Sequence, residues 1–198
     1  ARMTWPNCHV TVAQTGAEAV QQFTTESVDL VILDVNMPVL DGFDVCQCIR
    51  STSSVPILMS TVRSEVLDKV RALDLWADDY VTNPCDHLEL FARLRALLRR
   101  SRETVDVDNS VFISDDVSID FAAGIVHVQG EIVHLTSTEC RLLEVLVRNA
   151  GIVVPQQRLL EQAWGPEYVG DRQYLKVFVQ RLRRKLGDDA ASPRYIHT

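Results

Sequence analysis

The first half of the chain alternates between short apolar runs and stretches with apolar residues at helical spacing. Continuous apolar runs at residues 28–33 and 55–59 are typical of strands buried on both faces of a parallel sheet. The same criteria predict strands at residues 10–15 and 79–82, and helices at residues 17–26, 43–50, 64–75 and 86–100. This order of strands and helices predicts a doubly wound α/β sheet.

The pattern changes after residue 100. Residues 101–110 are polar and lack periodicity, which predicts a linker between a first domain at residues 1–100 and a second at residues 111–198. The second domain begins with short strands separated by glycine turns, at residues 117–120, 125–129 and 132–135, and this predicts a small antiparallel sheet. Helices are predicted after a capping box at residues 136–139, from residue 155, and over residues 171–186.

Composition limits where the protein acts and what it binds. The net charge is −7 and the pI is about 5.2, so a nucleic-acid surface has to be local. No apolar run approaches the roughly 20 residues that a membrane-spanning helix needs. The five cysteines are an odd number without a Cys-x-x-Cys pair, which argues against a disulfide framework or a zinc site. We expect a cytoplasmic protein with reduced thiols.

Asp34 ends a buried apolar run, at the edge of a parallel sheet where ligands bind. Three segments then carry a family resemblance: DVNMPVLDG at residues 34–42, PILMST at residues 56–61 and ADDYVTNP at residues 77–84. Together they resemble the receiver domain of two-component response regulators over residues 9–100. The resemblance implies that Asp34 is the phosphoacceptor, that Thr61 and Tyr80 are switch residues, and that Mg²⁺ is held by Asp34 and the backbone of Asn36.

The chain departs from the receiver pattern at two places. Asn83 stands where the family has a lysine that pairs with the phosphoryl group, and an amide supplies no charge there. The family's first strand, which ends in an acidic pair that binds Mg²⁺, does not precede Asp34, so we expect the receiver to lack that strand and to bind no metal here. Three interpretations of Asp34 stay open: a phosphoacceptor, a degenerate receiver that works without phosphate, and a hydrogen-bonded acid without function.

The receiver resemblance also implies a homodimer. In the family, a face with charges of both signs forms the symmetric contact, and its members here are Lys69, Asp78, Asp79 and Arg93. The alternative is an ordinary solvated charged face.

The predicted helix at residues 171–186 concentrates positive charge. It carries six basic residues and one acid in a chain whose net charge is −7. Leu175, Val179, Leu182 and Leu186 fall on one stripe and are expected to contact the core. We expect the opposite side to project, with Gln173, Val177, Gln180, Arg181 and Arg184. A basic outer face suits a helix in the DNA major groove, although a solvated helix is the plainer alternative.

Residues 111–198 resemble the winged helix-turn-helix effector domain of the OmpR/PhoB family, close to KdpE-like members. The segments that carry the resemblance are LTSTECRLLEVLVRNAG, RLLEQAWG and YLKVFVQRLRRKLG. It implies that Trp164 is a core residue, that residues 165–170 contact RNA polymerase, and that the wing is incomplete. The implied DNA-binding residues are Arg172, Lys176, Gln180, Arg181, Arg183 and Arg184.

The whole chain is therefore interpreted as a transcription regulator that pairs with a sensor histidine kinase and is not an enzyme. The competing interpretations are a phosphorylation-independent regulator, a module that dimerises without binding DNA, and a doubly wound hydrolase with Asp34 as nucleophile. No Walker lysine and no Gly-x-Ser-x-Gly motif supports the hydrolase.

Overall fold

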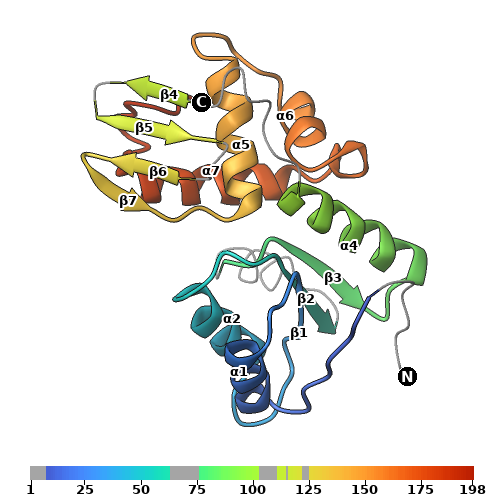
Figure 1. Cartoon of the computed structure of the whole chain (residues 1–198). Helices are drawn as coiled ribbons and strands as arrows, with labels where there is room; N and C mark the ends of the chain where they lie inside the picture. The colour runs from blue at the N-terminus through green and yellow to red at the C-terminus, as the bar shows by residue number, and fades with distance from the viewer. Residues whose placement is uncertain (1–7, 63–75, 103–110, 115, 122–124) are drawn as a thin grey trace.

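The computed structural model describes residues 8–62, 76–102, 111–114, 116–121 and 125–198. Two separate sheets organise the described residues, one parallel with three strands and one antiparallel with four. Figure 1 shows that α7 (Arg172–Leu186) lies on the side of the C-terminal part that faces the parallel sheet. The helix expected at residues 64–75 lies outside the described residues.

The N-terminal sheet is parallel, in the order β1 (Val31–Asp34), β2 (Ile57–Val62), β3 (Asp79–Asn83). Alternate side chains of β2 enter different cores. Ile57 and Met59 pack in the cluster that contains α2 (Gly42–Arg50), whereas Leu58 packs with α4 (His87–Arg102). Helices thus cover both faces of the sheet, as the doubly wound prediction requires; α1 (Gly16–Thr25) lies next to α2.

The start of α2 lies very close to the end of β1. Asp41 caps this helix, because its Oδ1 accepts hydrogen bonds from the backbone N–H groups of Phe43 and Asp44 at 2.9 Å. A Cβ atom on Gly42 would lie 2.2 Å from the carbonyl oxygen of Asp34. Glycine is therefore needed here, and this close approach fixes the loop that follows Asp34.

Two predictions about the N-terminal part differ from the structure. Residues 10–13 are described but form no strand. A strand needs a neighbour for its ladder of hydrogen bonds, and within the described sheet β1 pairs only with β2. In addition, α4 continues to Arg102, two residues into the expected linker.

The C-terminal part begins with a meander of β4 (Val111–Ser114), β5 (Val117–Asp120), β6 (Ile125–Val128) and β7 (Glu131–Val133). Strand β4 was not predicted. The capping box is confirmed at α5 (Ser137–Arg148), where Glu139 accepts from the Thr136 N–H at 2.9 Å and Thr136 Oγ1 accepts from the Glu139 N–H at 3.4 Å. The remaining elements are α6 (Gln156–Ala163), the short η2 (Pro166–Tyr168) and α7.

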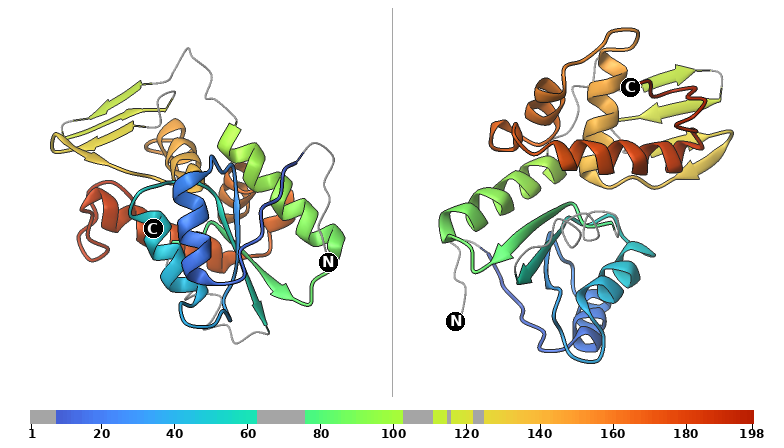
Figure 2. Two further views of the ribbon diagram at one scale, coloured as in Figure 1. Left: turned by 60° about the horizontal axis from the view of Figure 1, so that its bottom comes forward. Right: turned by 180° about the vertical axis from the view of Figure 1, so that it is seen from behind.

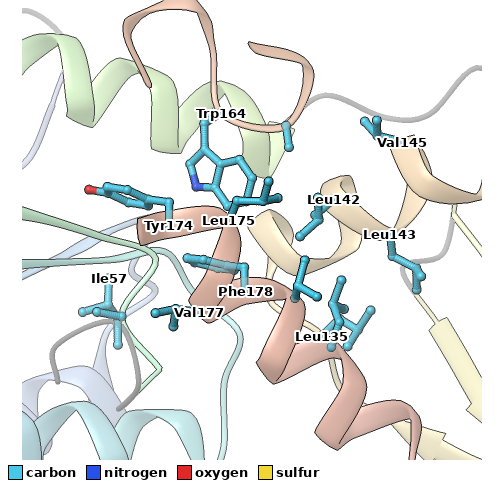
Figure 3. Close-up of a cluster of buried hydrophobic side chains, with 14 of the residues drawn as sticks. Ile57, Leu135, Leu142, Leu143, Val145, Trp164, Tyr174, Leu175, Val177 and Phe178 are labelled. Atoms are coloured by element: carbon cyan, nitrogen blue, oxygen red, sulfur yellow. The ribbon is translucent and has the colours of Figure 1, made fainter. Parts of the chain in front are cut away.

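Aromatic and aliphatic side chains from three helices form the core of this part (Figure 3). Trp164 follows α6, is 1% exposed and meets Phe178 of α7 edge to face, with ring centroids 5.0 Å apart. Its predicted place in the core is confirmed. No described helix is long and apolar enough to cross a membrane.

Candidate phosphoacceptor site and nucleic-acid interface

The strand ends bring the predicted phosphoacceptor residues to one edge of the parallel sheet. Asp34 pairs in register with Ser60, the residue before Thr61, and Asn83 pairs with Val62. Asp34 is half-buried, and its Oδ1 accepts a hydrogen bond from the Asn36 N–H at 2.9 Å. Thr61 is buried and Asn83 is exposed. Asp34, Thr61 and Asn83 therefore share the carboxyl edge, where a ligand of such a sheet binds.

A magnesium ion is not accommodated by this edge alone. Within the described ranges, no group of three or more His, Cys, Asp or Glu side chains is placed to hold a metal ion. The carboxylate of Asp41 caps α2, so Asp34 at the end of β1 is the carboxylate that remains to bind a metal ion there. One carboxylate without an acidic neighbour is a weak donor set for Mg²⁺. The residues present do not fit the ion.

Asp78 and Asp79 do not lie on an open face. Both are fully buried, which corrects their expected place on a dimer surface in this arrangement of the chain. Asp78 pairs with Arg50 at 2.6 Å and accepts from the Ile57 N–H at 3.0 Å. Lys69 lies outside the described residues.

Asp79 is buried because the C-terminal part covers it. Its carboxylate accepts hydrogen bonds from the hydroxyl groups of Tyr168 and Tyr174 and pairs with Arg93 at 3.0 Å. Arg93 also donates to the Tyr174 hydroxyl at 3.3 Å. Burial, followed by the charge of Asp79, raises the pKa of both tyrosines above the ordinary value, so they remain neutral donors. The expected dimer residues Asp79 and Arg93 thus contact the chain's own C-terminal part.

Tyr80, the predicted switch aromatic, contacts α7 directly. Its ring stacks on Tyr174 with centroids 5.5 Å apart and an interplanar angle of 16°. Burial, and next the charge of Asp171, raises the pKa of Tyr80 to about 12. The switch position therefore lies at the boundary between the two parts of the chain.

One face of α7 is open to solvent. The core stripe is confirmed, since Leu175, Val179, Leu182 and Leu186 are all buried. Four of the residues predicted to bind DNA are exposed along the helix: Arg172, Lys176, Gln180 and Arg184. Gln173 is exposed as well. Positions 172, 176, 180 and 184 repeat every four residues and so form one continuous stripe.

Two residues expected to project from α7 are buried instead. Val177 is 3% exposed and Arg181 is 1% exposed. Arg181 Nη2 donates to the carbonyl of Ala77 at 3.0 Å, and its Nη1 lies 3.7 Å from Glu139. Burial lowers the pKa of Arg181 in spite of this carboxylate. The expectation fails because a second stripe, Tyr174, Val177 and Arg181, packs against the receiver.

Arg183 and Lys185 are half-buried and occupied within the C-terminal part. Arg183 Nη2 donates to the carbonyl of Ile196 at 2.7 Å and to Thr198 Oγ1 at 3.3 Å. Lys185 donates to the carbonyl of His134 at 2.7 Å and pairs with Glu139 at 2.6 Å. The second stripe of α7 was not predicted from the sequence. The helical spacing of Tyr174, Val177 and Phe178 could have indicated it, because these residues make the apolar side of the helix wider than one stripe.

A parallel-sheet domain with an acid at its carboxyl edge, followed by an antiparallel sheet and three helices of which the last is basic, is the architecture of a response regulator with a DNA-binding effector domain. The comparisons agree. Residues 3–95 match the family model described as response regulator receiver domain, and residues 130–198 match the one described as transcriptional regulatory protein, C terminal.

Relatives of known type cover most of the chain. It is 42% identical over 190 residues to the sensory transduction protein RegX3 of Mycolicibacterium smegmatis. The matched region covers 95% of this chain and 83% of the relative. It is 44% identical over 186 residues to the KDP operon transcriptional regulatory protein KdpE of Escherichia coli, with 94% and 82% covered. The chain belongs to the OmpR/PhoB family of two-component response regulators.

A solved structure supports the fold. A RitR mutant superposes with a TM-score of 0.73 over 94% of this chain and 82% of that one, at 24% identity. This likeness concerns the fold alone. The chain consists of a receiver domain with a parallel sheet, followed by a winged-helix effector domain.

Proposed function

We propose that the chain binds promoter DNA through the solvent-exposed stripe of α7. The observation that carries the proposal is the row of Arg172, Lys176, Gln180 and Arg184 on the open side of a helix whose other side is anchored in the core. Arginine and glutamine can read base edges in the major groove, and lysine and arginine also neutralise phosphates. Arg181 and Arg183 belong to the same proposed interface, but Arg181 has to leave Ala77 first.

Removal of one exposed cation tests this interface. Arg172→Ala should weaken binding of a random-sequence 30-base-pair duplex, measured by fluorescence anisotropy at constant low salt, because one phosphate contact is lost. A loss of about 1 kcal/mol is expected. Arg95→Ala removes an arginine of α4 in the receiver that is also exposed, and it serves as the matched control. Equal losses for both variants would contradict the assignment to α7.

The receiver is the proposed control element. We place the phosphoacceptor at Asp34, with Thr61, Tyr80 and Asn83 as switch positions, a sensor histidine kinase as phosphodonor, and dimerisation and promoter binding as the controlled steps. A second candidate is a regulator that works without phosphate. It is favoured by Asn83, which supplies no positive charge, and by the lack, among the described residues, of a group of three or more His, Cys, Asp or Glu side chains that could hold a metal ion.

A phosphodonor experiment decides between the two candidates for this chain. After incubation with Mg²⁺ and acetyl phosphate, intact mass spectrometry should show an unchanged mass if the second candidate holds, because the described residues place neither a metal-binding acidic pair nor a lysine beside Asp34. An adduct of about 80 Da, the mass of a phosphoryl group, that disappears in Asp34→Asn would establish Asp34 as a working phosphoacceptor.

The remaining proposals follow from the family. The domain division is residues 1–100, 101–110 and 111–198, supported by the two sheets and by the two matched segments. Residues 165–170 contact RNA polymerase, and two copies of the chain form a homodimer. The site of action is the cytoplasm, and the chain performs no catalysis of its own beyond accepting a phosphoryl group.

A further inference from the structure

Two arginine side chains of α4 contact the same tyrosine of η2. The guanidinium carbon of Arg93 lies 5.2 Å from the ring centroid of Tyr168, and that of Arg100 lies 5.6 Å from the same centroid. Figure 1 and the right-hand view of Figure 2 both show α4 passing beside the segment that joins α6 to α7. Cations within about 6 Å of an aromatic ring are attracted to its face. Tyr168 therefore joins two cations of α4 to the C-terminal part.

The two cations differ in their hydrogen-bond partners. Arg93 pairs with Asp79 at 3.0 Å and with Glu89 at 3.0 Å, so carboxylates balance its charge. Arg100 is 4% exposed, and its Nε donates to the carbonyl oxygen of Ala96 at 3.1 Å. Its Nη1 and Nη2 atoms are buried and have no hydrogen-bond acceptor among the described residues. Arg100 is therefore a buried cation whose two terminal nitrogens lack acceptors in that part of the chain.

A second buried donor borders the same group of aromatic rings. Trp164 is 1% exposed, and within the described ranges its Nε1 has no acceptor either. The ring centroids of Trp164 and Tyr174 are 6.2 Å apart, and those of Tyr174 and Tyr168 are 5.3 Å apart, both edge to face. In Figure 3 the ring nitrogen of Trp164 lies on the side of Tyr174. Buried donors from α4 and from the end of α6 thus lack acceptors around one aromatic cluster.

The chemistry of the guanidinium group indicates what its partner is. Burying a charge costs much free energy unless hydrogen bonds and an opposite charge compensate for it. The two terminal nitrogens of an arginine are spaced to donate to two oxygen atoms of one carboxylate or phosphate. Asp79 does not take this role, because two tyrosine hydroxyl groups and Arg93 already donate to it. The partner that Arg100 requires is an anion with at least two oxygen atoms.

We propose that Arg100 binds a small oxyanion at the junction of α4 and η2. A phosphate or carboxylate group has the charge and the two oxygen atoms that Nη1 and Nη2 require. Both nitrogens are covered by neighbouring atoms, so the anion enters when the last turn of α4 and η2 separate locally. The bound anion then connects the end of α4 to η2. This proposal does not depend on DNA binding by α7.

Thermal unfolding of the full chain in inorganic phosphate tests the site. The melting temperature should rise with phosphate up to about 20 mM at constant ionic strength, because a ligand that binds only the folded state stabilises it. Phosphate also stabilises folded proteins in general, so Arg100→Met is the comparison. This variant should bind phosphate at least about tenfold more weakly, and in chloride it should melt at a higher temperature because an unpaired buried charge is gone. Arg95→Ala, at an exposed arginine of the same helix, should keep the full rise.

A second variant keeps the test valid if Arg100→Met does not fold cooperatively. Arg100→Lys keeps the charge but loses the paired donors, so its affinity for phosphate should fall about tenfold. Sodium acetate in place of phosphate separates the two sources: a rise with both anions supports a site that also accepts carboxylates, and a rise with phosphate alone supports a phosphate site. An equal rise in the unmodified chain and the Arg100 variants would indicate an adventitious ion only, and no rise beyond that in chloride would also overturn the proposal.

Discussion

Asp188 is the residue that fixes the segment after α7. Its carboxylate is buried and accepts hydrogen bonds from the backbone N–H groups of Arg194 at 2.6 Å, Tyr195 at 3.4 Å and Ile196 at 3.1 Å. Arg183 Nε lies 3.9 Å away. Burial by itself would raise the pKa of this carboxyl, but the three backbone donors and Arg183 hold the pKa below its ordinary value. The ionised form therefore stabilises the fold.

Asp188→Asn tests this role through its pH dependence. The variant keeps the shape but loses the charge, so the free energy of unfolding at pH 7 should fall by about 1–3 kcal/mol. Because the pKa is lower in the folded chain, the stabilisation is complete above the unfolded value of about 4 and is lost as pH falls through the folded value. The difference between the two proteins in urea unfolding should therefore shrink below pH 4. Asp189→Asn, at the exposed neighbour, should change little; a difference that persists at low pH would contradict the account.

At the scale of elements, the local pattern of apolar and polar residues predicted which segments form helices or strands and which residues face the core of the same domain. The apolar runs identified β1 and β2, and the capping box and leucine spacing identified α5 and the core stripe of α7. β4 was missed because its four residues directly follow a polar stretch. The strand predicted at residues 10–13 is absent from the structure. The prediction failed because a strand depends on a neighbouring strand, which the local pattern does not reveal.

The second stripe of α7 depends on residues far away along the chain. Tyr174 meets a carboxylate 95 positions before it, and Arg181 meets a carbonyl 104 positions before it. Spacing along the helix indicates which residues share a side, but it does not say what covers that side. The order of the strand ends predicted that Asp34, Thr61 and Asn83 lie together. The burial of Asp78 and Asp79 was not predicted, because it depends on residues far away along the chain.

At the scale of the whole molecule, the sign of the charge varies strongly with position. The chain carries −7 in total, yet α7 has six basic residues, three of which are buried or occupied by hydrogen bonds within the chain. The negative charge of the rest of the chain limits nonspecific association with nucleic acid. The regulator is thus expected to bind DNA through a local basic surface on α7.

The most direct test of this central claim is the salt dependence of duplex binding by the unmodified full chain. Exposed Arg172, Lys176 and Arg184 provide about three phosphate contacts, so log affinity plotted against log salt should fall with a slope of about −2 to −4. A slope near zero, or no binding at the lowest salt, would contradict the assignment of α7 as the DNA-binding element.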